Sequence, residues 1–136
     1  MTPAPIQSLL DSRALLLIGR VVLTFMFWAS GLAKLLNFQG GVAEMSHFGL
    51  EPAWLFNVLT IIVQIGGSLL IIFNRAAWLG AGALAVFTAL TIPIAHPFWQ
   101  LEGETAMFEM LVALEHVTVI GGLIVVAILG HRMARR

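Results

Sequence analysis

AWLFNVLTIIVQIGGSLLIIF, residues 53–73, is the stretch that decides the fold of this chain, because it contains no charged side chain. About 20 helical residues, each rising about 1.5 Å, cross the roughly 30 Å hydrocarbon core of a bilayer. Lipid offers no hydrogen-bonding partner to backbone N–H and C=O groups, and a helix satisfies these groups within one segment. Residues 53–73 therefore predict a transmembrane helix.

Three further apolar runs of similar length occur at residues 14–33, 76–95 and 110–130. The chain has 136 residues, of which 60% are hydrophobic and 10% charged, whereas soluble domains are about 25% charged. A membrane barrel would need alternating segments of about ten residues, and the sequence has none. The sequence therefore predicts an all-α fold, with residues 1–136 forming a single domain that is a four-transmembrane-helix bundle.

Residues 35–52, which link the first two runs, have the apolar spacing of a helix that lies on the membrane surface. The apolar positions are Leu35, Leu36, Phe38, Val42, Met45, Phe48 and Leu50. Gly49 to Pro52 then predict the end of that helix. We expect a short amphipathic helix in this first outer loop.

The second outer loop, residues 96–109, begins with a run of ring-bearing side chains, His96-Pro97-Phe98-Trp99. Tryptophan is enriched at membrane interfaces, so anchoring alone would explain Trp99. The run also follows directly on the third span, where a polar interior would open. We expect His96, Phe98 and Trp99 to cap the outer mouth of the bundle.

Charged residues divide unequally between the two sides of the predicted bundle. With four spans, both termini share a side with the Asn74-Arg75 turn. That side carries five basic residues, whereas the opposite loops carry Lys34 alone; the five are Arg13, Arg75, Arg132, Arg135 and Arg136. Because positive charge marks the cytoplasmic side, we expect both termini in the cytoplasm.

Two global features exclude classes of function. The formal net charge is zero, so the chain has no basic field for nucleic acid. It contains no cysteine, which excludes disulfides, thiolate metal sites and a cysteine nucleophile. The sequence also has no glycine-rich phosphate loop, nucleophile elbow or HExxH motif.

Four polar residues lie within the predicted spans: Arg20, Gln64, Glu115 and His116. Because a charge at a helix centre costs about 2.5–3.5 kcal/mol, such groups face the bundle interior and find partners. Their depths predict that Arg20 bonds Gln64, Glu115 or both. Three interpretations stay open: a clamp that performs no chemistry, a polar pocket that binds a headgroup or relays protons, and an Arg20 that snorkels to the cytoplasmic headgroups.

Histidines raise the question of a metal or haem. Glu44 and His47 lie one helical turn apart, but a carboxylate-bridged metal site needs a second such pair. His96 and His116 are the one candidate pair of axial haem ligands. We expect no metal site, and we interpret His96, beside Pro97, as a hydrogen-bonding anchor of its loop.

Short motifs follow one another along the chain in a characteristic order. Arg20 lies eleven residues before Gly31 of a Ser30-Gly31-x-x-Lys34-Leu35 motif. The later motifs are Met45 with Gly49 and Pro52, Gly66-Gly67, Arg75-Ala76-Ala77, His96-x-Phe98-Trp99 and Gly121-Gly122. This order and spacing, over residues 14–130, resembles the DoxX family of small membrane proteins.

Two positions depart from the family pattern. The family usually has Glu where this chain has Gln64, and Lys-Asn where this chain has Glu115-His116. Compared with the family pattern, this chain has its carboxylate in the fourth span instead of the second, and it lacks the lysine of the fourth span. Any mechanism that needs a lysine at position 115 is therefore in doubt.

The resemblance implies a four-helix bundle in the inner membrane of a bacterium, close to quinone and redox chemistry. DoxX-like proteins are similar to small subunits of thiosulfate:quinone oxidoreductases and terminal oxidases, or take part in oxidative stress, thiol homeostasis and quinone resistance. More distant relatives act as membrane chaperones or cargo receptors. A shared fold does not choose among these roles, nor does it decide whether the chain is an enzyme.

We expect a quinone-associated redox or oxidative-stress subunit, because a quinone needs an apolar slot and donors to its carbonyls. The candidate ligand-binding residues are Arg20, Lys34, Gln64, His96, Phe98, Trp99, Glu115 and His116. A quinone is the one cofactor expected, and electron transfer would need a membrane redox partner or the quinone itself. The alternatives are a non-catalytic membrane partner or assembly factor, and a small-molecule transporter, for which one bundle is small unless it forms a homo-oligomer.

Overall fold

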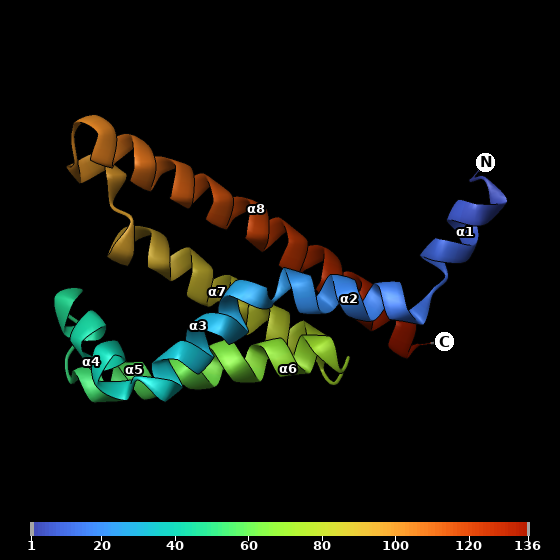
Figure 1. Cartoon of the computed structure of the whole chain (residues 1–136), viewed down its shortest axis with the longest axis horizontal. Coiled ribbons are helices and arrows are strands. Elements are labelled where there is room, and N and C mark those ends of the chain that lie inside the picture. The colour runs from blue at the N-terminus through green and yellow to red at the C-terminus, as the bar shows by residue number, and fades with distance from the viewer. Residues whose placement is uncertain (1, 136) are drawn as a thin grey trace.

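The computed structural model describes residues 2–135, and all regular secondary structure in that range is helical. The elements are α1 (Ala4–Leu10), α2 (Arg13–Leu23), α3 (Phe25–Leu36), α4 (Phe38–His47), α5 (Ala53–Ile61), the π-helical turn η1 (Ile62–Gly66), α6 (Gly67–Ile72), α7 (Ala77–Ala95), the 3-10 turn η2 (Phe98–Gln100) and α8 (Gly103–Ala134). Figure 1 shows them as a bundle of long helices with α1 projecting at one end. The predicted all-α fold is confirmed.

The four predicted spans correspond to elements of this bundle. Three continuous segments are long and apolar enough to cross a membrane: Ala53–Ile72, Ala77–Gln100 and Gly103–Ala134. The first predicted span corresponds to α2 and α3, which are long and apolar enough to cross when the two helices are taken together. A four-span bundle is therefore supported by length and composition.

The first span is bent, whereas the sequence predicted one helix over residues 14–33. Helices α2 and α3 meet at an angle of 55°. At the break, the fully buried Thr24 donates its hydroxyl to the Arg20 carbonyl at 2.8 Å, and such back-bonding bends helices. The Trp28 indole donates to the Val21 carbonyl at 3.3 Å, so the bend leaves that carbonyl satisfied without water.

Helix α8 is longer than the span predicted over residues 110–130. It begins at Gly103 and ends at Ala134, 32 residues in all, which is about 48 Å at 1.5 Å per residue. Its first turn contains Glu104, and a carboxylate at a helix N-terminus is favoured by the helix dipole. Residues 103–109 therefore extend the helix and do not belong to the loop.

The predicted helix of the first outer loop is confirmed as α4. Its buried residues are Gly41 and Met45, one turn apart on the face that meets α5. The fully buried Asn57 of α5 donates its amide to the Phe38 carbonyl at 3.3 Å. A Cβ at Gly41 would collide with that same amide, so glycine allows α4 to sit directly on α5.

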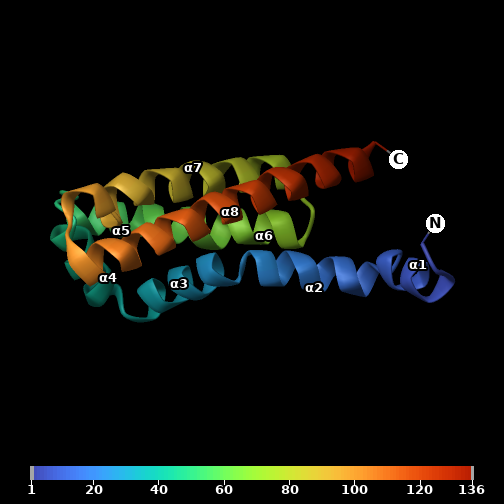
Figure 2. The same ribbon diagram turned by 90° about the horizontal axis from the view of Figure 1, so that it is seen from above.

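Charge separates the two ends of the bundle. Both termini lie at the end where α6 turns into α7 (Figures 1 and 2). We call this the basic end, since Arg13, Arg75, Arg132 and Arg135 lie there; Arg136 lies outside the described residues. The opposite, acidic end holds α4, η2 and the start of α8, with Glu44, Glu51, Glu102, Glu104 and Glu109.

The apolar core lies where α3, α6, α7 and α8 meet. Its buried members are Phe27, Ile71, Ala81, Leu84, Leu123 and Val126. Helices α6 and α7 approach so closely that a Cβ on Gly80 would lie 2.6 Å from the Gly67 carbonyl oxygen. Toward the acidic end, the α4–α5 pair and the α7–α8 pair diverge (Figure 1), and α4 and α5 share no extensive packing with α8 within residues 2–135.

Candidate functional site

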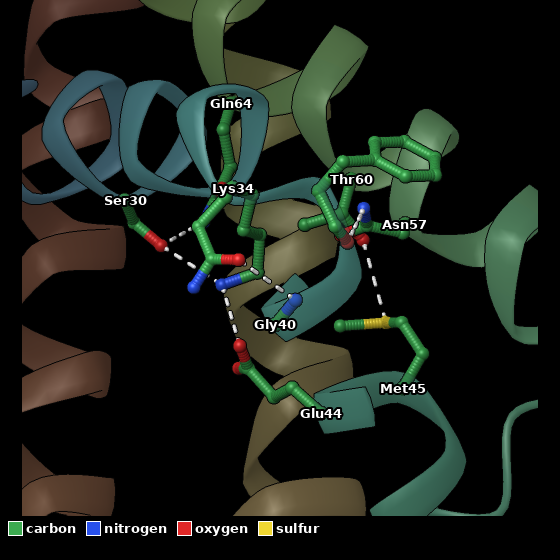
Figure 3. A network of polar contacts seen from close by, with 10 residues as sticks. Ser30, Lys34, Gly40, Glu44, Met45, Asn57, Thr60 and Gln64 are labelled. Carbon is green, nitrogen blue, oxygen red and sulfur yellow. Dashed lines mark hydrogen bonds and ion pairs between the residues drawn. The ribbon is translucent and has the colours of Figure 1, made fainter. Parts of the chain in front are cut away.

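Polar side chains from three elements meet around one hydroxyl in the acidic half of the bundle (Figure 3). Ser30 of α3 accepts hydrogen bonds from Lys34 Nζ and from Gln64 Nε2, each at 3.3 Å. Lys34 Nζ also lies 2.9 Å from a carboxylate oxygen of Glu44 on α4. We call Ser30, Lys34, Glu44 and Gln64 the Ser30 cluster.

Close helix packing positions Gln64 in this cluster. A Cβ on Gly31 would lie 2.8 Å from Ile65 Cγ1 and 3.1 Å from Gln64 Cβ, so the glycine lets α3 approach η1. Gln64 is the middle residue of the π-helical turn, and such turns occur frequently at functional sites because they re-aim the side chains they carry.

One atom of the cluster has no partner within the protein. Gln64 is 6% exposed, and its Oε1 accepts no hydrogen bond in the described residues. A buried polar atom without a partner typically costs about 1–3 kcal/mol. The cluster therefore offers an acceptor at Gln64 Oε1 beside donors on Lys34 and Ser30, which suits a small ligand with both kinds of group.

The ion pair of the cluster lies at its exposed side. The Lys34 side chain is 12% exposed, whereas that of Glu44 is 45% exposed. Ion pairs with an exposed member typically contribute no more than about 1 kcal/mol. Glu44 can therefore move aside at small cost, which would leave the Lys34 ammonium free for a ligand oxygen.

Two of the predicted site residues meet at the end of α7, apart from the Ser30 cluster. His96 Nδ1 lies 2.5 Å from Glu109 Oε2, and the His96 and His116 rings are in edge contact with centroids 4.9 Å apart. His116 Nδ1 lies 2.8 Å from the Val112 carbonyl oxygen. The contacting rings leave no room for a porphyrin between them, so the axial haem pairing considered from the sequence is wrong.

A metal site finds no support in this arrangement either. Within residues 2–135, no three His, Asp or Glu side chains are placed to hold a metal ion together. Glu44, considered from the sequence beside His47, is paired with Lys34 instead.

The ring-bearing loop, residues 96–99, lies at the acidic end of the bundle. The turn η2 packs back on α8, and the Phe98 and Trp99 rings meet edge to face with centroids 5.1 Å apart. Trp99 is 54% exposed. That His96, Phe98 and Trp99 cap the mouth stays a prediction, and an exposed indole also fits the interpretation of Trp99 as an interfacial anchor.

The predicted pairing of Arg20 with Gln64 or Glu115 is also wrong. The Arg20 guanidinium donates to Met133 Sδ at 3.7 Å, near the end of α8. Gln64 bonds Ser30, and Glu115 lies on the exposed side of α8. The Arg20 side chain extends toward the basic end, which is the direction that the snorkelling interpretation requires. The depth of Arg20 along its helix did not predict in which direction its side chain would extend.

Three contributors to this region were not among the predicted site residues. Ser30 lies four residues before Lys34 on one helix face, a spacing that places two side chains side by side. Asn57 lies seven residues before Gln64, which places both on one face of the second span. Glu44 could be placed only once α4 was docked on α5.

A separate apolar groove of about 490 Å³ runs along α7. Its lining residues are Val63, Trp78, Leu79, Gly82, Ala83, Val86, Phe87 and Leu90. Apart from the Trp78 indole, these side chains offer no polar group with which to orient a ligand. The Ser30 cluster is thus the better candidate for recognition of a polar headgroup.

Comparison with known proteins gives two matches. The family model described as DoxX matches residues 15–97. Inner membrane protein YphA of Escherichia coli (strain K12) is 25% identical over 116 residues, which is 85% of this chain and 83% of that protein. No solved structure matches the chain. The range matched by the family model contains all four residues of the Ser30 cluster.

Proposed function

This chain belongs to the DoxX family and is an integral protein of the inner membrane, and from this premise we propose that its Ser30 cluster binds the headgroup of a membrane quinone. Quinones dissolve in the bilayer and would reach the cluster from lipid. The matched range holds the whole cluster but not the last span, which is consistent with a ligand site built on the first two spans.

Complementary hydrogen bonding supports this proposal. A quinone carbonyl accepts hydrogen bonds, which the Lys34 ammonium and the Ser30 hydroxyl can donate. A quinol hydroxyl donates one, and the buried Gln64 Oε1 has no other donor within the described residues. That unpartnered oxygen, buried beside the donors of Lys34 and Ser30, is the observation that carries the proposal, because buried polar atoms are normally hydrogen-bonded.

The role we assign to this chain is binding, within a redox or oxidative-stress assembly. The sequence contains no cysteine to hold an iron–sulfur cluster, so we assign electron transfer to a membrane redox partner. The contact face we assign to that partner is α8, on which Glu115 lies exposed. An intramembrane carboxylate outside any ion pair is costly in lipid, and a partner subunit or a second copy would shield it.

A titration of the purified protein in detergent with a short-chain quinone, followed by tryptophan quenching, tests the binding. We expect Gln64→Leu to weaken binding about five- to tenfold, since one buried hydrogen bond contributes about 1–1.5 kcal/mol. Gln39→Leu, which alters an exposed glutamine on α4, is the matched control and should bind as the wild type does. Equal affinity in both variants would contradict the proposal and favour the non-catalytic assembly factor.

We also propose that the basic end faces the cytoplasm. The support is the excess of arginine at that end over the single Lys34 at the other. A reporter active only outside the cytoplasm, fused after the last residue, should give no signal. A strong signal from that fusion would invert the orientation.

A further inference from the structure

Arg20 is a buried cation that has no counter-ion among the described residues. It is 7% exposed, and the partner of its guanidinium is the thioether of Met133 at 3.7 Å, a weak acceptor. Its Nε has no hydrogen-bond partner, and neither ion pair within residues 2–135 includes it. An unpaired buried charge is strongly unfavourable, so a bound anion would stabilise Arg20 at this position.

Helix packing places the guanidinium toward the basic end of the bundle. A Cβ on Gly122 would lie 2.9 Å from Leu23 Cδ1, which fixes how α2 lies against α8. Arg20 is one turn closer to the basic end than Leu23, and its side chain extends to Met133, in the last turn of α8. The cation therefore lies in the seam between α2 and α8, level with the last turn of α8 at the basic end.

The surroundings of the seam favour a lipid as the source of the anion. Arg13, Arg132 and Arg135 are exposed at the same end, and basic residues near a membrane surface attract anionic lipids. Asp11 is the one carboxylate between the N-terminus and Arg20, and it pairs with no arginine in the described residues. Leu17 is 47% exposed and Leu129 44%, which gives acyl chains an apolar surface beside the charge.

We propose that Arg20 binds the phosphate of an anionic phospholipid in the α2–α8 seam at the basic end. A guanidinium presents a planar fork of N–H donors that matches phosphate oxygens in pairs. The bound phosphate would neutralise the buried charge and hold the first span against the last. This site is separate from the Ser30 cluster, so the proposal does not depend on quinone binding there.

Native mass spectrometry tests the site on full-length protein released from nanodiscs of phosphatidylcholine that contain a minority of phosphatidylglycerol. We expect the wild type to retain phosphatidylglycerol selectively, and Arg20→Gln to lower that retention about tenfold, the effect of losing one charge-assisted hydrogen bond. Arg132→Gln, which removes an exposed arginine from the same end, is the matched control and should retain the lipid.

Three outcomes would overturn the proposal. The first is equal retention by Arg20→Gln and the wild type, and the second is equal retention of phosphatidylcholine and phosphatidylglycerol. The third is displacement of the lipid by millimolar inorganic phosphate, which would make a free anion the ligand. If Arg20→Gln does not fold, Arg20→Lys serves instead: it keeps the charge without the fork, and we expect it to retain phosphatidylglycerol about threefold less well than the wild type.

Discussion

The basic and acidic halves of the bundle are built from the same spans but packed in different ways. Toward the basic half, α6, α7 and α8 close around apolar side chains, and glycine lets α6 and α7 touch. In the acidic half the helix pairs diverge (Figure 1), and polar side chains link α3, α4 and η1. The difference indicates that one half is a scaffold and the other is available for binding.

The largest expected effect comes from enlarging a glycine in the scaffold half. A Cβ on Gly80 would lie 2.9 Å from Leu70 Cβ and closer still to the Gly67 carbonyl, whereas a Cβ on Gly82 would meet nothing within 4 Å. Gly80→Val should therefore lower the free energy of unfolding by about 3 kcal/mol or prevent folding. Gly82→Val should change it by less than about 0.5 kcal/mol. Circular dichroism during unfolding in mixed detergent would measure both, and equal losses would contradict the close packing of α6 on α7.

A smaller and more local effect is expected in the acidic half. Asn57→Ala removes the hydrogen bond to the Phe38 carbonyl and should cost about 1–3 kcal/mol. Amide hydrogen exchange should rise across residues 38–48 and stay unchanged in α7. The exposed Gln39 of α4 supplies the control, Gln39→Ala, which should leave exchange as it is. Loss of protection throughout the bundle would show that the two halves are not independent.

The bend of the first span should depend on one hydroxyl. Thr24→Val keeps the shape of the side chain but removes the donor to the Arg20 carbonyl, at an expected cost of about 1 kcal/mol. Thr118 makes a similar bond, to the Leu114 carbonyl at 3.2 Å, on the exposed side of α8. Thr118→Val should be neutral in the same unfolding assay. A Thr24→Val variant as stable as wild type would mean that packing alone sets the bend.

The smallest expected effect is that of Arg20 and Glu115 on each other, because we expect no coupling between their contributions to the free energy of unfolding. Arg20 and Glu115 belong to different halves and share no ion pair in the described residues. Arg20→Leu and Glu115→Leu, made singly and together, should therefore change the unfolding free energy additively to within about 0.5 kcal/mol. A coupling above about 1.5 kcal/mol would restore the buried pair predicted from the sequence.

Hydropathy and periodicity were enough to predict the spans and α4, because both depend on which side chains avoid water. Three other features depend on tertiary contacts. Thr24 bends the first span through a hydrogen bond to the Arg20 carbonyl of its own helix. A threonine in the sequence does not by itself predict such a bend. Arg20 was placed by depth, but its long side chain points along the helix toward Met133. Lys34 and Gln64 were both proposed as ligand-binding residues, but the hydroxyl that joins them, on Ser30, depends on how α3 lies against η1.

Photolabelling of the protein in native membranes with an azido-quinone, followed by peptide mapping, tests most directly whether the acidic half binds the quinone. We predict label on peptides from α3 and η1, around Ser30 and Gln64, with loss of this label in Gln64→Leu and its retention in Gln39→Leu. Label on α7 between Trp78 and Leu90, or labelling of α3 that persists in Gln64→Leu, would contradict the assignment of the Ser30 cluster as the quinone site.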